Sequence, residues 1–349
     1  MAVRRSGMDL AESISELGLA DRVPHLSAAV DRSKVATERM RAALADFDSG
    51  GGAMDVVAFG SLARQEYTPA SDVDYLVLVD AMPEDPAVPH ELLSRIRDCL
   101  SVEATADGSS KSPGATGLFG RAAGIYDIIN QVGLEGDTNS THTVRMEVIQ
   151  ESVSLLNAEV HSKILGSTLR RYITLFDVPQ ARPPRFLLND MLRYWRQITV
   201  DYQAKTPVGG QEPKAVMRYL KLLTTRKNFI ASSILPLIAP RDLEVPWEVY
   251  LKDMYSIPPL ARLATVTKNA PDPVKDAVRT VFSTIDLFIE NTESADKRKR
   301  WNTLPWEARK SDDGYRVFRA AAEELQLAFE CIFLDWDDVA KNTRSYLLL

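Results

Sequence analysis

Two carboxylates separated by one residue, Asp72 and Asp74, are the side chains of this sequence with the clearest potential for chemistry. Successive side chains of an extended chain point to opposite sides, so we expect both carboxylates on one face. Neighbouring carboxylates repel each other, and a divalent cation removes that repulsion because Mg²⁺ prefers hard oxygen ligands. The pair therefore predicts a site for Mg²⁺ or Mn²⁺.

A second group, Gly60, Ser61 and Arg64, precedes this pair, with ten residues between Ser61 and Asp72. Gly60 permits a tight turn, and Ser61 can offer a hydroxyl and a backbone N–H to a phosphate. Arg64, one helical turn further on, can reach the same phosphates with its forked guanidinium group. Nucleotidyl transfer requires a bound metal ion and groups that bind phosphate. A metal site beside a phosphate-binding turn therefore indicates this reaction.

Both groups border short apolar runs, 54–59 and 75–79, which we predict to be buried strands. This arrangement resembles the signature of the nucleotidyltransferase superfamily typified by DNA polymerase beta. The residues Gly60 to Glu66 and Pro69 to Asp74 are most similar to the bacterial branch that includes the PII uridylyltransferases. The resemblance covers about 30 residues of 349.

The resemblance implies an α+β fold in which a small mixed-sheet nucleotidyltransferase head domain precedes an all-α helical bundle. It also implies a nucleoside triphosphate substrate, with ATP as the default donor. An NMP would pass to a hydroxyl acceptor with release of pyrophosphate. The acceptor stays open between a small molecule, a protein and RNA.

The same residues allow other interpretations. The residue types of Pro69 to Asp72 favour a turn, so the segment could be a plain βαβ turn with an acidic end. Arg64 could be a surface residue paired with Glu66 or Asp72. A catalytically impaired protein of this fold, acting as a regulatory partner or in a toxin–antitoxin or defence module, is the second functional hypothesis.

In the superfamily a third strand often supplies a third carboxylate. We expect that strand at 125–132, with Asp127 inside it and Asp137 just beyond it. Glu103 and Asp107 are weaker options. Asp137 is our candidate third metal ligand, and the alternative is that Asp137 or Asn139 caps the following helix.

Basic residues in the second half of the chain form two further sets. Lys214, Arg218 and Lys221 recur at helical spacing and predict a basic stripe for the triphosphate, or else a solvated face. Residues 293–300, with four consecutive basic residues at 297–300, predict a charged loop that is solvated or contacts nucleic acid. The aromatic residues Tyr194, Trp195 and Tyr219 fit a core better than a base-stacking site.

The pattern of apolar residues predicts N-terminal helices within 1–48, a nucleotidyltransferase domain over 49–176 and a helical domain over 185–349. Segments 81–89 and 105–120 predict loops, and 177–184 predicts a linker. Further helices are expected at 91–102, 141–156, 161–176, 185–204, 212–236, 245–254, 257–267, 271–292 and 314–340.

The composition is that of an ordinary globular chain, 45% hydrophobic and 26% charged. A net charge of −6 argues against a large non-specific nucleic-acid surface but not against a local basic cleft. The two cysteines and four histidines lack the spacing of a zinc site. With no signal peptide and no membrane-length apolar run, we expect a cytoplasmic protein.

Overall fold

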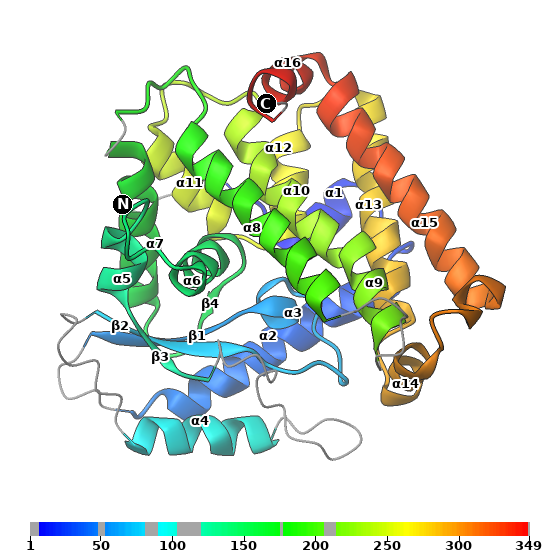
Figure 1. The fold of residues 1–349 in the computed structure, drawn as a ribbon, viewed down its shortest axis with the longest axis horizontal. Coiled ribbons are helices and arrows are strands. Elements are labelled where there is room, and N and C mark those ends of the chain that lie inside the picture. The colour runs from blue at the N-terminus through cyan, green and yellow to red at the C-terminus, as the bar shows by residue number, and fades with distance from the viewer. Residues whose placement is uncertain are drawn as a thin grey trace. The chain divides into compact units, whose positions relative to one another are not determined.

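The computed structural model describes residues 7–47, 53–80, 90–102, 120–174, 177–205 and 214–347. It confirms the α+β class, with a small mixed sheet and many helices (Figure 1). The expected loops at 81–89 and 105–119 lie outside the described residues. No helix of the described part is long and apolar enough to cross a membrane.

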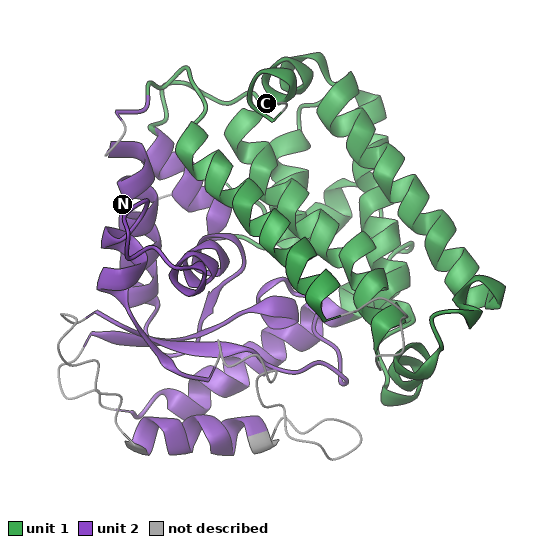
Figure 2. Ribbon diagram, in the orientation of Figure 1, with its two compact units in different colours: residues 1–28, 179–246, 257–349 green, residues 29–178, 247–256 purple. Residues whose placement is uncertain are grey.

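The chain forms two compact units (Figure 2). Unit 1 comprises residues 1–28, 179–246 and 257–349, and unit 2 comprises residues 29–178 and 247–256. The three-part division expected from the sequence remains a prediction.

Unit 2 contains a four-stranded sheet with the order β3-β2-β1-β4. The strands are β1 (Met54–Ala58), β2 (Tyr75–Val79), β3 (Ala122–Gly124) and β4 (Val153–Ser154). β1 pairs antiparallel with β2 and with β4, whereas β2 pairs parallel with β3. Both central strands are buried along their whole length, which explains why each reads as a continuous apolar run.

Helices cover the sheet of unit 2 on both faces (Figure 1). One face packs on α2 (Pro24–Leu44) and α4 (His90–Val102) through Val56, Val77, Met40 and Ile96. The other face packs on α5 (Ile125–Asn130), α6 (Asn139–Gln150) and α7 (Ala158–Thr174). The helix α11 (Trp247–Tyr255) joins this unit by packing on α7.

Unit 1 is helical. Its helices are α1 (Leu10–Glu16), α8 (Arg185–Ala204), α9 (Ala215–Leu223), α10 (Thr225–Ile238), α12 (Pro259–Thr267), α13 (Asp272–Glu290), α14 (Ala295–Thr303), α15 (Asp313–Glu330) and α16 (Asp337–Tyr346). One apolar cluster of this unit joins α9, α13, α14 and α15 through Val216, Leu220, Phe288, Trp301 and Phe318.

Several elements differ from the sequence-based expectation. The strand predicted at 125–132 is wrong, because 122–124 is the strand and Ile125–Asn130 is helical. The helix predicted over 212–236 is two helices that meet at Thr224, where φ is −117° and ψ is −91°. The charged loop predicted at 293–300 is wrong as well, since Ser294 caps the helix α14 there.

Two predicted helices end early. The helix predicted over 141–156 ends at Gln150, and β4 follows it. The helix predicted over 314–340 is interrupted by a π-helical turn, Cys331–Asp335, before α16 begins.

Candidate functional site

The turn after β1 places Gly60 next to the second carboxylate. Gly60 has φ of +68°, a left-handed conformation that glycine adopts without steric strain. The backbone N–H of Phe59 donates to the carbonyl of Asp74 at 2.9 Å, so β1 and β2 stay paired up to the turn. A Cβ on Gly60 would lie 3.8 Å from Asp74 Oδ2. The turn and the acidic segment are therefore immediate neighbours.

Ser61 is the second residue of the short helix α3 (Gly60–Ala63), directly after Gly60. Its side chain is half-buried. Within the described residues the Ser61 hydroxyl makes no hydrogen bond. The hydroxyl is thus available to a ligand at the turn.

Asp72 and Asp74 lie on one side of the extended segment that enters β2. Val73, between them, is buried in the same apolar cluster as Tyr75. Leu76, two residues after Asp74, belongs to the cluster on the opposite face of the sheet. Asp72 is exposed and Asp74 is half-buried. The alternation of side chains along an extended chain therefore indicates that both carboxylates face the side of Leu76.

The loop between the turn and Asp72 is fixed by buried hydrogen bonds. The backbone N–H of Thr68 donates to Ser71 Oγ at 3.1 Å, and the two hydroxyl oxygens lie 3.0 Å apart. The N–H of Tyr67 donates to Ser33 Oγ of α2, and Arg32 Nε donates to the Tyr67 carbonyl. These bonds connect the loop before Asp72 to α2 and to itself.

Arg64 has two carboxylate partners. Its Nε donates to Glu66 Oε2 at 2.8 Å, and its Nη1 donates to Glu151 Oε2 at 2.6 Å. The Arg64 side chain is only 15% exposed, so it is not the surface residue of the alternative interpretation. Burial acts to lower the pKa of Arg64, but the two carboxylates outweigh burial and raise it. Arg64 thus links the Gly60 turn to the end of α6.

Glu66 is 4% exposed, and burial raises its pKa even though Arg64 opposes the shift. Glu66 was one of the two partners that the sequence predicted for Arg64. Glu151 was not expected, because a partner 87 residues away leaves no local signal. A phosphate-binding role for Arg64 remains a prediction.

The structure gives Asp137 a buried arginine as its partner. Arg145, fully buried on α6, donates from Nη1 to Asp137 Oδ1 at 3.0 Å and from Nη2 to Oδ2 at 2.8 Å. Thr141 Oγ1 and the N–H of Gly133 donate to the same carboxylate. Burial acts to raise the pKa of Asp137, but these donors lower it overall. Its carboxylate is therefore used in a structural ion pair, and its role as a metal ligand remains untested.

The other proposed acids take different places. Thr138 caps α6 by accepting from the N–H of Thr141, so the expectation that Asp137 or Asn139 caps this helix is wrong. Asp127 lies exposed in the first turn of α5, where it was expected in a strand. Glu103 and Asp107 lie outside the described residues.

Asp55, a carboxylate inside β1, was not predicted from the sequence to have a role. It is fully buried, and its Oδ1 accepts from Ser154 Oγ and from the N–H groups of Leu156 and Asn157. Burial raises the Asp55 pKa to about 6, against the lowering effect of these donors. Asp55 thereby joins β1 to the start of α7. A charged residue inside an apolar run was the available signal.

The basic stripe predicted to bind triphosphate, Lys214, Arg218 and Lys221, belongs to unit 1. Lys214 precedes α9 with φ of +72°, so it lies outside the helix that was expected to carry it. Arg218, on α9, donates from Nη1 to the carbonyl of Lys205. Lys221 is half-buried in the same helix. Binding of phosphate by these three residues remains a prediction.

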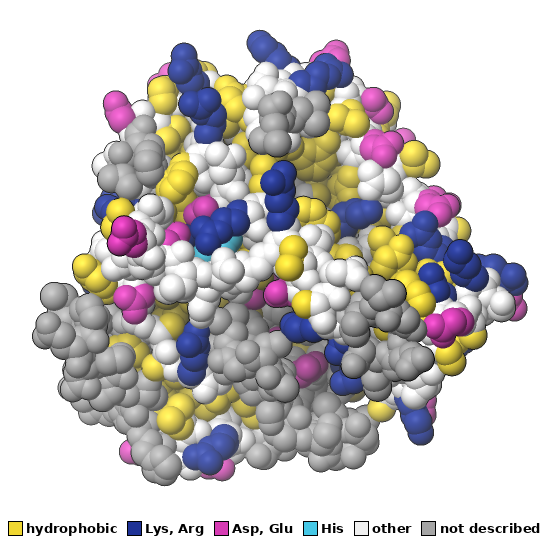
Figure 3. All heavy atoms as spheres, viewed as in Figure 1, with side chains coloured by type: hydrophobic (Ala, Val, Ile, Leu, Met, Phe, Trp, Pro, Cys, Tyr) yellow, Lys and Arg dark blue, Asp and Glu magenta, His cyan; other side chains and the backbone are white. Residues whose placement is uncertain are grey.

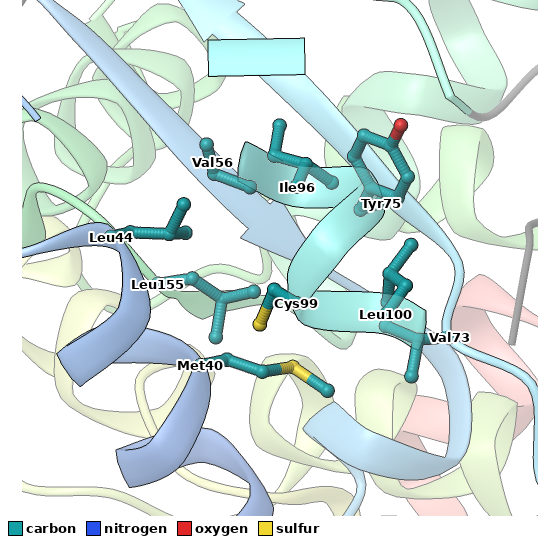
Figure 4. Close-up of a pocket in the computed structure, with 9 residues that line it drawn as sticks. All are labelled: Met40, Leu44, Val56, Val73, Tyr75, Ile96, Cys99, Leu100 and Leu155. Atoms are coloured by element: carbon teal, nitrogen blue, oxygen red, sulfur yellow. The ribbon is translucent and has the colours of Figure 1, made fainter. Parts of the chain in front are cut away.

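A small apolar pocket lies on the other face of the sheet (Figure 4). It is lined by Met40, Leu44, Val56, Val73, Tyr75, Ile96, Cys99, Leu100 and Leu155. Val73 points into this face while Asp72 and Asp74 belong to the opposite one. A triphosphate needs polar and cationic partners, so this cavity does not suit it.

A known protein family is similar to the segment that contains the candidate site. Residues 39–107 match the model of the nucleotidyltransferase domain family. The matched span contains Gly60, Ser61, Arg64, Asp72 and Asp74, and supports the nucleotidyltransferase superfamily for this part of the chain. A comparison with curated proteins found no match.

Proposed function

We propose that this protein is a Mg²⁺-dependent nucleotidyltransferase that moves an NMP from a nucleoside triphosphate to a hydroxyl acceptor. The acceptor oxygen forms a bond to the α-phosphorus and loses its proton to solvent. The bond from the α-phosphorus to the bridging oxygen breaks, and pyrophosphate leaves. One observation carries the proposal: the Asp74 carboxylate, two residues after Asp72, lies next to the Gly60 turn within the segment that matches the family model.

Asp72 and Asp74 would hold the metal ion, since two carboxylates on one side supply the hard oxygen ligands that Mg²⁺ and Mn²⁺ prefer. Within the described residues no group of three or more metal-binding side chains occurs, so the proposal rests on this pair. Such an ion, when bound, neutralises phosphate charge and orients the triphosphate.

The residues of the turn complete the proposed site. Ser61 donates its hydroxyl to a phosphate oxygen of the triphosphate. Gly60 leaves room for the Asp74 carboxylate beside the turn. Arg64 holds the turn through Glu66 and Glu151 and contributes to the phosphates through its remaining N–H groups. Lys214, Arg218 and Lys221 are proposed as further triphosphate ligands from the helical part of the chain.

The donor and the branch of the superfamily belong to the proposal too. The residues Gly60 to Glu66 and Pro69 to Asp74 favour the bacterial branch that includes the PII uridylyltransferases. ATP is the proposed donor, because most bacterial relatives outside the PII enzymes use it. We also propose that the protein is located in the cytoplasm. The proposed acceptor carries a hydroxyl group.

The proposal is tested by label transfer from each α-³²P-labelled NTP to a cell lysate in the presence of Mg²⁺. We expect label from ATP to become bound to one class of acceptor, and the label to be absent with Asp72→Asn and Asp74→Asn. Chelation of the metal should abolish the transfer in the same way. Labelling that persists in both variants would rule out these carboxylates as the catalytic pair.

A further inference from the structure

Positive charge is concentrated in one part of unit 1. Residues 214–227 contain five Lys or Arg and no Asp or Glu. Residues 294–319 contain eight Lys or Arg and four Asp or Glu. The whole chain has a net charge of −6. We call these two segments together the basic surface.

Packing brings the two segments together. The N–H of Lys214 donates to the Asn302 carbonyl at 3.0 Å, which joins the start of α9 to α14. Arg319 Nη1 donates to the Tyr219 hydroxyl at 3.5 Å, and Lys227 Nζ donates to Gln326 Oε1 at 2.8 Å. These contacts place α9 and the start of α10 against α15.

The apolar faces of the same helices are turned inward. Leu220 of α9, Trp301 of α14 and Phe318 of α15 meet in one buried cluster with Phe288 of α13. The charged residues of these helices are left on the outer faces. In Figure 3, Lys and Arg side chains gather over the N-terminal part of α15.

Carboxylates neutralise only part of this charge. Arg300 pairs with Asp312, Arg319 with Glu323, Lys297 with Glu293 and Arg316 with Asp313. Within the described residues, the exposed cations Arg226, Lys299 and Lys310 form no ion pair. The Lys227 pKa is lowered by burial and by the nearby charge of Arg319. Unneutralised positive charge therefore remains on the surface.

Half-buried aromatic rings lie among the cations. Tyr219 and Trp306 make an edge contact with ring centroids 5.5 Å apart, and Tyr202 lies 6.1 Å from Tyr219. The guanidinium of Arg309 lies 3.5 Å from the centroid of the Trp306 ring. Each of these three aromatic side chains keeps part of its surface accessible. Rings interleaved with Lys and Arg are the surface that binds unstacked bases together with their phosphates.

We propose that the basic surface binds single-stranded nucleic acid, with its cations on the phosphates and the Trp306–Arg309 pair against a base. Duplex nucleic acid keeps its bases stacked, so rings interleaved with cations favour a single strand. An anionic membrane would use both the charge and the rings, and the vesicle control of the test separates it from nucleic acid. The proposal goes beyond nucleotidyl transfer and does not rest on it, because binding is measured without NTP.

The test is fluorescence anisotropy of the full chain with labelled 20-nucleotide RNA and DNA strands of one sequence, without NTP or metal, over a series of salt concentrations. We expect binding that weakens with salt. The charge reversal Lys299→Glu/Lys310→Glu should weaken it at least tenfold and lower the slope of log K against log salt by about 1.4, at about 0.7 per phosphate contact. Preference for RNA or for DNA identifies the natural strand.

The matched control is Lys341→Glu/Arg344→Glu, two exposed cations of α16 in the same unit. It makes the same charge change and should alter binding less than twofold. Trp306→Leu should weaken binding about fivefold or more, from the loss of stacking, while Trp306→Phe retains most of it. Asp72→Asn should bind like the wild type, which separates this proposal from catalysis.

Three results would overturn the proposal. One is the absence of binding to either strand at low salt. Another is an equal loss of binding in the Lys299/Lys310 variant and in the α16 control. The third is equal binding of duplex, of poly-glutamate or of vesicles containing phosphatidylserine, together with no effect of Trp306→Leu.

Discussion

Asp74 Oδ2 lies 3.8 Å from the position that a Cβ on Gly60 would occupy. This proximity ties the turn after β1 to the second carboxylate of the proposed metal pair. A side chain at residue 60 would contact the carboxylate directly, and the positive φ of Gly60 would add backbone strain.

Gly60→Ala should therefore reduce both stability and nucleotidyl transfer. The left-handed backbone costs an alanine about 1–2 kcal/mol of unfolding free energy. Contact with Asp74 should further lower the affinity for metal and NTP. Denaturant unfolding and pyrophosphate release measure the two effects.

Gly18→Ala is the matched control for this change. Gly18 has φ of +67°, but a Cβ there would meet no atom within 4 Å. The control should lose a similar amount of stability and keep its activity. Equal activity of the two variants would show that the contact between residue 60 and Asp74 has no functional role.

Arg64 should be a major contributor to stability, because its removal leaves two buried carboxylates without their cation. We expect Arg64→Met to lower the unfolding free energy by about 3–5 kcal/mol. Glu151→Gln, which keeps a hydrogen-bond acceptor and leaves Glu66 in place, should lower it by about 1 kcal/mol. An Arg64→Met variant as stable as the wild type but inactive would instead make Arg64 chiefly a phosphate ligand.

Asp137 and Arg145 should also act as a structural pair. Asp137→Ala leaves a fully buried guanidinium uncompensated, which costs about 3–5 kcal/mol of unfolding free energy. The double variant Asp137→Ala/Arg145→Met should recover part of that loss. Unchanged stability combined with lost transfer in Asp137→Asn would instead support a third metal ligand.

Two buried groups should have opposing effects on stability in acid. Burial raises the Asp55 pKa to about 6 in the folded protein, so protonation stabilises the fold as pH falls from 6 towards 3.8. Burial, with a smaller effect of Arg41, lowers the His161 pKa to about 4, so protonation of the unfolded chain destabilises the fold as pH falls from 6.5 to 4.

In the wild type these two contributions nearly cancel. Asp55→Asn removes the first, so its unfolding free energy should drop by roughly 3 kcal/mol more than that of the wild type between pH 6.5 and 4. Denaturant unfolding at each pH measures this difference. Parallel pH profiles of the two proteins would show that Asp55 is charged in the folded state throughout.

The sequence predicted the elements whose pattern was unambiguous. β2 (Tyr75–Val79) and α8 (Arg185–Ala204) have the expected bounds, since one is a continuous apolar run and the other is strongly amphipathic. The acidic pair and the Gly60 turn followed from residue types at fixed spacing. Their proximity could be expected because both flank neighbouring strands of one sheet.

The errors have physical causes that single-sequence reasoning weighs poorly. Ile125, Ile128, Ile129 and Val132 repeat at helical spacing, so the run that we took for a strand had the period of α5. The helix α14 is rich in charge, but Trp301 anchors it in the core. Tertiary packing thus overrides local composition.

The partners of the charged residues could not be predicted. Nothing in the sequence paired Glu151 with Arg64 or Arg145 with Asp137. Both pairs are formed by α6, whose long buried face is set by its position between α5 and α7. Pairing of this kind depends on packing rather than on local sequence.

Nucleotidyl transfer by Asp72 and Asp74 is tested most directly by measuring pyrophosphate release from each NTP with Mg²⁺, with a lysate as the source of acceptor. We expect pyrophosphate release with one NTP. The release should be lost in Asp72→Asn/Asp74→Asn and kept in Asp98→Asn, which changes an exposed acid of α4. Release that survives in the double variant, or that is absent from the wild type with all four NTPs, would contradict this expectation.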